Sequence, residues 1–437
     1  MTSRSLKLKE RIFILAIENH KNNNFDVAKS LYNKIIKIDP NHEKAHNNLG
    51  VIYQSLGNSK KAKKYFEKVI EINPNYDDAQ FNLGVIFQIL GKQQKAKNCF
   101  EKAIEVNPTH AGAHNSLGNI FKILGKHQKA KSCFEKAIEV NPTHVGAHNS
   151  LGNTLDILGE YQNAKRCFEK AIEINPNYTP AYWNLFILSS NIDEALVFLK
   201  KLNIINNKHP ETKIMIGTLQ AYKGDFNYFN DLLTSEDSNH SYIRSAKWIF
   251  SLPKLPKIFF NRWDFYDAII SLSESSRPFY EFGVWNGVSF KYLINTFKKG
   301  FGFDTFCGLP ESWGNIKKST YSSFGSIPNI KGGEFIVGKF EDTLPKFFAK
   351  ERPLASLINF DADLYTSTLC ALNHSNKTID HKTILIFDEF IMNKRWEEDE
   401  YKALNDFCDN LGFKYEVLAV SFVSKQVAIK LIKISSQ

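Results

Sequence analysis

The sequence predicts an α-helical solenoid followed by an α/β domain that contains a mostly parallel sheet. Three observations lead to this fold class. The first half repeats with a period of 34 residues, marked by Pro40, Pro74, Pro108, Pro142 and Pro176. Beyond residue 241, apolar runs of strand length alternate with helical segments, as in parallel sheets covered by helices on both faces. The last two apolar runs, 415–420 and 426–432, are separated only by SFVSK and predict an antiparallel hairpin.

The 34-residue period also fixes small and aromatic residues. Its recurring positions are Ala45, Ala79, Ala113, Ala147 and Ala181; Gly50, Gly84, Gly118 and Gly152; Gly57, Gly91, Gly125 and Gly159; and Phe66, Phe100, Phe134 and Phe168. Small residues allow paired helices to approach closely, and the second glycine suits the turn between them. This pattern resembles the tetratricopeptide repeat (TPR), a helix–turn–helix unit. We expect about five full repeats and a partial one over 1–205, then degenerate capping helices and a linker over 206–241.

Asparagines recur just before the Leu-Gly pair of the repeats, and at the corresponding position before Leu185-Phe186. They are Asn47, Asn48, Asn82, Asn115, Asn149 and Asn184. In the tetratricopeptide family these positions line the concave surface. A row of amides can donate and accept hydrogen bonds along an extended peptide, which favours a protein or peptide partner there. The alternative is that these side chains are ordinary polar surface.

Histidines at 110 and 114, and at 144 and 148, are spaced i, i+4, as metal ligands on a helix often are. Each pair straddles a helix start and both pairs come from one duplicated unit. We therefore do not expect a metal there.

Composition restricts the class of protein. At 437 residues, with ordinary apolar and charged fractions, the chain fits two or three globular domains. No apolar stretch approaches the length of a membrane span, and the N-terminus does not resemble a signal peptide. Six cysteines without CxxC spacing fit a reducing compartment, so we expect a cytoplasmic protein. Residues 1–200 hold 27 Lys+Arg against 19 Asp+Glu, but Lys/Glu-rich repeat helices usually present solvated faces, so nucleic acid is not an expected partner.

The second half, 242–437, places its acidic residues at strand ends. The predicted strands are PFYEFGV (278–284), GFGFDTF (300–306), EFIVGKF (334–340), ASLINFDAD (355–363) and KTILIFDEF (382–390). The acids that stand at their carboxyl ends are Glu281, Asp304, Asp361, Asp363, Asp388 and Glu389. Ligands of open α/β sheets bind beyond this edge, so we expect these acids to converge on one site.

The first two strand ends predict a nucleoside cofactor. In EFGVWNGVSF, Gly283 and Gly287 allow close backbone approach and a helix N-terminus that faces a ligand. Asp304 stands where an acid can accept both ribose hydroxyls, although that acid alone does not separate S-adenosylmethionine (SAM) from NAD. Phe340 can stack beside an adenine, or it is simply a core residue.

The last two strand ends predict a cation site. Asp361, Asp388 and Glu389 would form a three-carboxylate cage for a hard divalent ion such as Mg²⁺. Bound metal would acidify a substrate hydroxyl, and Asp363 would accept the proton as general base. The alternative is that the DLYTST acid only caps a helix. His374 and His381 are available as other bases.

Taken together, the phrases EFGVWNGVSF, GFDTFCGLPESW, GKFEDTLP, DADLYTSTL and FDEF resemble the macrocin O-methyltransferase-like (TylF-type) group of class I SAM-dependent methyltransferases, which act on sugar hydroxyls. The resemblance implies a Rossmann-like domain with a mostly parallel seven-stranded sheet and a C-terminal antiparallel hairpin. It implies that Glu281, Gly283 and Gly287 hold the methionine part of SAM and Asp304 its ribose. It also implies Mg²⁺ on Asp361, Asp388 and Glu389. The characterised relatives have Asp-Asp where this chain has Asp388-Glu389, which puts the metal geometry in question.

The sequence therefore predicts a Mg²⁺-assisted, SAM-dependent O-methyltransferase acting on a sugar or glycan hydroxyl, fused to a TPR module that recruits a partner or the acceptor. Two rivals stay open. One is a non-catalytic TPR adaptor with a vestigial methyltransferase fold, and the other is an NAD-linked sugar enzyme, against which the missing GxGxxG counts.

Overall fold

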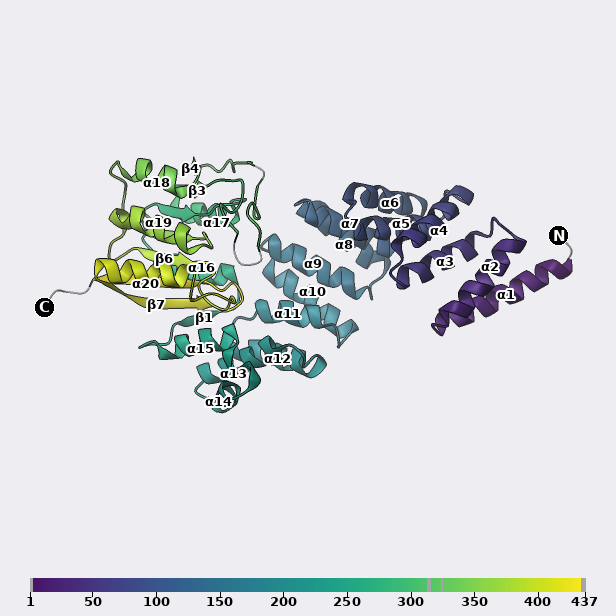
Figure 1. Cartoon of the computed structure of the whole chain (residues 1–437), viewed down its shortest axis with the longest axis horizontal. Helices are drawn as coiled ribbons and strands as arrows, with labels where there is room; N and C mark the ends of the chain where they lie inside the picture. Colours follow the sequence, from purple (N-terminus) through teal and green to yellow (C-terminus); the bar gives the residue numbers. More distant parts are fainter. Residues whose placement is uncertain (1–2, 313–315, 324, 434–437) are drawn as a thin grey trace. The chain divides into compact units, whose positions relative to one another are not determined.

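The computed structural model describes residues 3–312, 316–323 and 325–433, and Trp313 of the GFDTFCGLPESW phrase lies outside them. Contacts divide the chain into two units, Met1–Asn184 and Leu185–Gln437 (Figure 1). Each unit has its own buried core. No helix in the described part of the chain is long and apolar enough to cross a membrane.

The first unit consists of paired helices. Their bounds are α1 (Ser3–Lys21), α2 (Phe25–Ile38), α3 (Glu43–Ser55), α4 (Ser59–Ile72), α5 (Asp77–Ile89), α6 (Gln93–Val106), α7 (Ala111–Ile123), α8 (His127–Val140), α9 (Val145–Ile157) and α10 (Tyr161–Ile174). Each helix packs on the next one along the chain, as the purple-to-blue coils of Figure 1 show. The predicted helix–turn–helix repeat is confirmed.

The repeated glycines have the two roles that the sequence indicated. A Cβ atom on Gly118 would lie 2.6 Å from Phe134, and those on Gly50, Gly84 and Gly152 would be equally close to the phenylalanine of the following helix. The turn glycines have positive φ, for example +68° at Gly125, a conformation that other residues adopt at a cost. The 34-residue period thus reflects one contact between paired helices, glycine against phenylalanine, that is repeated four times.

Further helices begin the second unit. They are α11 (Thr179–Ile187), which spans the division, then α12 (Ile192–Ile205), α13 (Pro210–Tyr222), α14 (Asn227–Leu233), the 3₁₀ helix η1 (Glu236–Asn239) and α15 (Ser241–Ser251). The division between the units thus falls at 184/185, before the predicted solenoid end at residue 205. The end of the predicted linker, 235–241, forms η1 and the start of α15, because Ser235 and His240 cap these helices by accepting hydrogen bonds from Asp237 and Tyr242 N–H.

A single sheet organises the rest of this unit. Its strands are β1 (Lys257–Phe259), β2 (Phe279–Phe282), β3 (Gly300–Asp304), β4 (Gly333–Val337), β5 (Leu357–Phe360), β6 (Ile384–Phe387), β7 (Phe413–Ser421) and β8 (Val427–Lys433). Their order is β1-β7-β8-β6-β5-β2-β3-β4, in which β8 runs antiparallel to both β6 and β7 and the other neighbouring pairs are parallel. The predicted parallel strands and the C-terminal hairpin are confirmed.

Among the described residues the sheet has eight strands, so the predicted number of seven is wrong. The extra strand is β1, which pairs in parallel with β7 at one edge of the sheet. Its three residues, KIF, are too few to show the two-residue alternation by which a strand is recognised.

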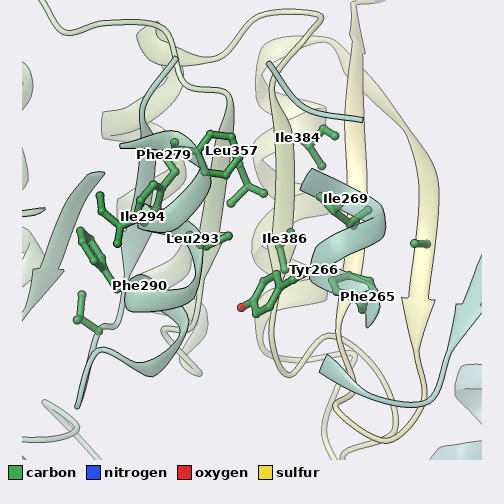
Figure 2. Close-up of a cluster of buried hydrophobic side chains, with 14 of the residues drawn as sticks. Phe265, Tyr266, Ile269, Phe279, Phe290, Leu293, Ile294, Leu357, Ile384 and Ile386 are labelled. Carbon is green, nitrogen blue, oxygen red and sulfur yellow. The ribbon is translucent and has the colours of Figure 1, made fainter. Parts of the chain in front are cut away.

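Helices cover both faces of the sheet. They are α16 (Arg262–Ser271), α17 (Val288–Phe297), α18 (Phe340–Phe348), α19 (Tyr365–Ser375) and α20 (Glu400–Leu411), with the 3₁₀ helix η2 (Asn376–Thr378) after α19. Figure 2 shows Phe265 and Phe290, from α16 and α17, packed with Phe279, Leu357 and Ile386 of the strands. On the other face Phe303 packs on Phe347 of α18. Burial on both faces explains why these strands read as continuous apolar runs.

Candidate functional site

A cavity of about 270 Å³ lies where the parallel strands end. Its walls come from the segments that follow β2, β3, β4, β5 and β6. Of the predicted residues, the ones that line it are Gly283, Asp304, Phe340, Asp361, Asp363, Asp388 and Glu389. The convergence expected from the strand ends is therefore present, and Arg262, Trp285 and Tyr321 join it.

Gly283 brings two strand ends together. Its φ is +91°, and a Cβ atom there would lie 1.8 Å from the backbone oxygen of Asp361. No residue with a side chain fits at this position without moving the β5 end. Gly287 also has positive φ and forms the N-cap of α17, but it is not among the residues that line the cavity.

Asp304 holds the loop that follows β2. Its Oδ2 accepts hydrogen bonds from the backbone N–H groups of Val284 (2.8 Å) and Trp285 (2.7 Å). Its Oδ1 accepts from Phe306 N–H (2.6 Å). A carboxylate has about four acceptor sites, so this acid keeps capacity for a ligand hydroxyl while it shapes the wall.

Glu281 lies in the sheet and does not line the cavity. It is fully buried, and its Oε1 accepts a hydrogen bond from Asn359 Nδ2 at 2.8 Å. Burial raises the pKa of Glu281 to about 8, although Ser289 and Asn359 favour its charged form. This acid therefore lies within β2, two residues before the cavity-lining Gly283.

Asp361 and Asp363 follow β5 on one short loop. Burial, and then the charge of Asp388, raise the pKa of Asp361 well above its ordinary value. Burial and the charges of Asp388 and Glu389 raise the pKa of Asp363 to about 7, near that of a useful general base. Asp363 also has φ of +58°, a strained conformation of the kind that gathers at functional sites.

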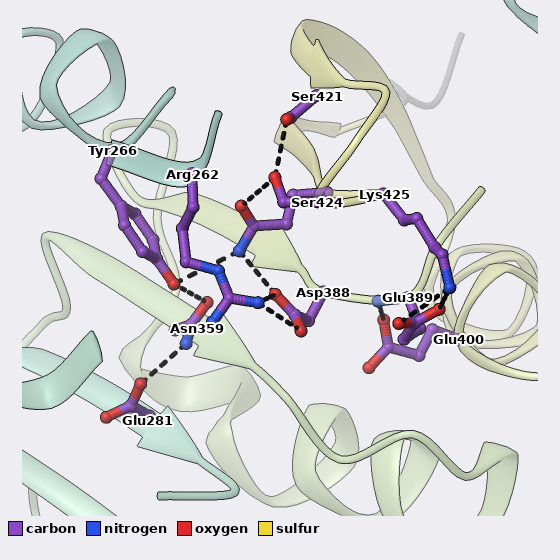
Figure 3. A network of polar contacts seen from close by, with 11 residues as sticks. Arg262, Tyr266, Glu281, Asn359, Asp388, Glu389, Glu400, Ser421, Ser424 and Lys425 are labelled. Atoms are coloured by element: carbon purple, nitrogen blue, oxygen red, sulfur yellow. Dashed lines mark hydrogen bonds and ion pairs between the residues drawn. The ribbon is translucent and has the colours of Figure 1, made fainter. Parts of the chain in front are cut away.

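Two cations that the sequence analysis missed pair with the acids after β6. Arg262 Nη2 lies 2.9 Å from both carboxylate oxygens of Asp388. Lys425 Nζ lies 2.9 Å and 3.2 Å from the two carboxylate oxygens of Glu389. The partners of each pair lie more than thirty residues apart in the sequence (Figure 3). No local sequence motif therefore indicates these ion pairs.

The predicted Mg²⁺ cage does not fit the side chains as they lie. Within the described residues, the cluster whose ligand atoms lie within 4.8 Å of one another is Asp77, Asp78 and His110, and the set Asp361, Asp388 and Glu389 does not meet that distance. Mg²⁺ requires oxygen ligands at about 2.0–2.1 Å. The carboxylates of Asp388 and Glu389 are instead paired with the positively charged side chains of Arg262 and Lys425.

Glu400, the first residue of α20, is a further buried acid that the sequence did not indicate. It is fully buried, and its Oε2 accepts a hydrogen bond from Glu389 N–H at 3.2 Å. Burial and the neighbouring carboxylates raise its pKa well above the ordinary value. An acid in the first helical turn usually faces solvent, so its sequence position gave no signal.

Two aromatic rings lie in the cavity wall. Trp285 and Tyr321 are 46% and 45% exposed, and their ring centroids are 6.0 Å apart in an edge-to-face arrangement. Both have positive φ, +48° and +60°. Burial and the negative charges of Asp363 and Glu389 raise the pKa of Tyr321. Exposed rings beside paired acids suit a ligand that has both apolar faces and polar edges.

The predicted partner-binding asparagines are less available than the sequence suggested. Asn47 and Asn149 are buried, and the other four are half-buried. Asn48 donates a hydrogen bond to the Tyr32 hydroxyl (3.1 Å), and Asn184 donates one to Asn149 Oδ1 (3.0 Å). Part of this row therefore serves contacts within and between repeats. Spacing alone does not separate such contacts from a ligand surface.

The repeated histidines hold the start of each helix. His110 and His144 Nδ1 accept hydrogen bonds from Ala113 and Ala147 N–H. His114 and His148 Nε2 lie 2.9 Å from the carbonyl oxygens of Pro108 and Pro142. The first histidine of each pair thus caps α7 or α9, and the second contacts the backbone of the preceding turn.

Family models agree with the geometry of the first unit. The tetratricopeptide repeat matches residues 12–42, 43–76, 78–110, 111–144 and 145–178. The first unit is a TPR solenoid. Repeats of this kind indicate a role in protein interaction.

Solved structures of TPR proteins are similar to this chain. MamA is 26% identical, with a TM-score of 0.33, covering 39% of this chain and 92% of its own. PilF of Pseudomonas aeruginosa is 18% identical, with a TM-score of 0.44 and coverage of 51% and 99%. YrrB, described as a TPR protein with an unusual peptide-binding site, is 22% identical, with a TM-score of 0.35 and coverage of 44% and 97%. No curated protein matches the sequence.

Proposed function

We propose that the second unit is a SAM-dependent O-methyltransferase for a sugar or glycan hydroxyl, and that the TPR solenoid recruits a protein partner or the acceptor. The observation that carries the proposal is the cavity at the carboxyl ends of β2, β3, β5 and β6, with acids from separate strands in its wall. Chain order reverses between β2 and β5, and ligands of open α/β sheets bind at such a switch point.

The residues present fit a nucleoside cofactor. Gly283 and Asp304 form adjoining parts of the wall, and Phe340 adds an aromatic ring that packs edge-to-face on Phe282. These three residues would hold the cofactor. When bound, SAM supplies an electrophilic methyl group.

The acceptor side of the cavity supplies the proton acceptor. Asp363, with a pKa of about 7, would take the proton from the attacking hydroxyl at neutral pH. Trp285 and Tyr321 would contact the apolar face of a sugar ring and exclude water around the hydroxyl. The resemblance of DADLYTSTL and FDEF to sugar methyltransferases is the ground for this acceptor class.

Binding of SAM tests the proposal without knowledge of the acceptor. We expect SAM to raise the melting temperature of the full chain. At a hundredfold excess over Kd, bound SAM should add about 2.7 kcal/mol to the free energy of unfolding. NAD should not raise it. If SAM does not change the melting temperature, the result would instead fit the rival hypothesis, a non-catalytic TPR adaptor with a vestigial methyltransferase fold.

Transfer of label tests the chemistry. Full chain incubated with methyl-labelled SAM and host extract should place the label on a glycan-containing molecule. Asp363→Asn should lose the transfer while it keeps SAM binding. Asp342→Asn, an exposed acid on α18, is the matched control and should behave as the unaltered chain. Equal labelling by Asp363→Asn would remove this acid from the mechanism.

The recruitment role is tested on the solenoid. Replacing Asn82 and Asn115 with Ala should weaken capture of the partner, because these half-buried amides can still reach a bound peptide. A melting curve is the control for a purely structural loss. Unchanged capture would move the binding surface elsewhere.

A further inference from the structure

We infer that Arg262 and Lys425 occupy the places that a divalent cation would need, so that the acidic cavity of this chain does not take up Mg²⁺. The inference concerns the acids after β6 and goes beyond the proposed methyl transfer. It rests on which side chains contact these acids and from which elements they come (Figure 3).

Asp388 has little room for another ligand. It is 7% exposed, and one guanidinium nitrogen of Arg262 is 2.9 Å from each of its oxygens. Gln426 Nε2 donates to Oδ1 as well, at 2.5 Å. A metal ion that bound this carboxylate would have to displace both donors, one of them a full positive charge.

Glu389 is paired in the same way from the hairpin turn. Both of its oxygens lie within hydrogen-bond distance of Lys425 Nζ. Lys425 has φ of +58°, which is unfavourable for a residue with a side chain. The turn between β7 and β8 keeps this conformation, and in it the ammonium group meets the second predicted metal ligand.

The amide of Gln426 is also fixed in direction. The Ser424 hydroxyl lies 2.9 Å from Gln426 Oε1 and can donate to it, which leaves Nε2 to face Asp388. Ser424 Oγ in turn lies 2.6 Å from Ser421 Oγ. Residues 421–426 therefore bring two donors to two adjacent carboxylates, as a built feature of the hairpin.

The other acidic cluster among the described residues does not provide an alternative Mg²⁺ site. Asp77, Asp78 and His110 lie close together in the solenoid. His110 Nδ1 accepts the N–H of Ala113, so in the neutral ring Nε2 carries the hydrogen and cannot ligate a metal.

Calorimetric titration of Mg²⁺ into the full chain tests the inference. The unaltered chain should show no saturable binding at millimolar Mg²⁺. The Arg262→Met, Lys425→Met double variant should bind Mg²⁺, because two adjacent carboxylates lose their compensating charges. Its apparent dissociation constant should be lower than that of the unaltered chain by about tenfold or more. If the double variant does not fold, Lys425→Met alone should show the gain at Glu389.

Lys382→Met is the matched control, since Lys382 pairs with Glu274 away from the cavity, and it should bind no Mg²⁺. Saturable binding by the unaltered chain that Asp388→Asn abolishes would overturn the inference. A folded double variant, which lacks both Arg262 and Lys425, would also overturn the inference if it still showed no Mg²⁺ binding. SAM affinity measured on the same samples separates these outcomes from failure of the proposed methyl transfer.

Discussion

The two units of this protein use polar side chains in opposite ways. In the solenoid, contacts are local and repeated: a histidine caps each of α3, α7 and α9, and a phenylalanine covers a glycine in each of four repeats. In the α/β unit, charged groups from several strand ends, from α16 and from the turn between β7 and β8 meet at one cavity, and their partners lie far apart in the sequence.

This difference explains which contacts could be predicted from the sequence. A contact that recurs at a fixed spacing can be read from the chain, because each copy repeats the signal. A contact made once, between distant segments, leaves no such pattern. Four predictions test this comparison, beginning with the largest expected effect.

Gly283→Ala should disrupt the α/β unit. The new Cβ would overlap the Asp361 backbone oxygen at 1.8 Å, and the φ of +91° adds strain. We expect a loss of about 4 kcal/mol or more in the free energy of unfolding of that unit, measured by urea denaturation.

Gly412→Ala is the control for that substitution. Its φ is also positive, at +68°, but no atom lies within 4 Å of the new Cβ. Its cost should be about 1 kcal/mol, from backbone strain alone. Equal losses at the two glycines would contradict the close approach of the β2 and β5 ends.

The stability of the α/β unit should fall as pH rises from about 5 to about 8. Glu281 and Asp363 have folded-state pKa values raised to about 8 and about 7, so the folded state keeps protons that the unfolded chain releases. Each such proton lowers the free energy of unfolding by up to about 1.4 kcal/mol per pH unit across that window. Urea denaturation at a series of pH values measures the slope.

Glu281→Gln should reduce that slope, because the buried side chain no longer titrates while Asp363 still does. Glu334→Gln, an exposed acid on β4, should leave it unchanged. A slope of opposite sign in the unaltered chain would show that these acids are ionised in the folded state.

Gly118→Ala should destabilise the solenoid by about 2 kcal/mol, since the new Cβ would lie 2.6 Å from Phe134 and the ring must move. Gly84→Ala and Gly152→Ala should cost about the same. Gly146→Ala, near the start of α9, meets only ordinary contacts and should stabilise the unit by about 0.5 kcal/mol. Unequal costs among the three repeat positions would contradict the equivalence of the repeats. Thermal melting of the full chain measures all four.

His144→Ala should have the smallest effect, about 1 kcal/mol, from loss of the cap on Ala147 N–H. His144→Asn should keep an acceptor and recover most of that stability. The shift in melting temperature caused by SAM should be the same in both variants, because the cap belongs to the solenoid. A change in that shift would show that the two units are coupled.

The repeat, most of the strands and the set of acids at their ends could be predicted from local patterns of residues. Helix and strand periods are local, and parallel strands bring their carboxyl ends to one edge of a sheet. Gly283, Asp304, Asp361, Asp363, Asp388 and Glu389 were found in this way. The short edge strand β1 and the helical character of 235–241 were missed, since each depends on pairing or capping by a few residues.

The cations that pair with those acids became evident in the folded chain. Arg262 comes from α16 and Lys425 from a hairpin turn, and each reaches its carboxylate across a long stretch of chain. The structure also showed that Glu281 and Glu400 are fully buried and that several asparagines make contacts within the solenoid itself. The physical reason is that the energy of a charge depends on its neighbours in space and on its exposure to water, and neither is encoded at the position of one residue.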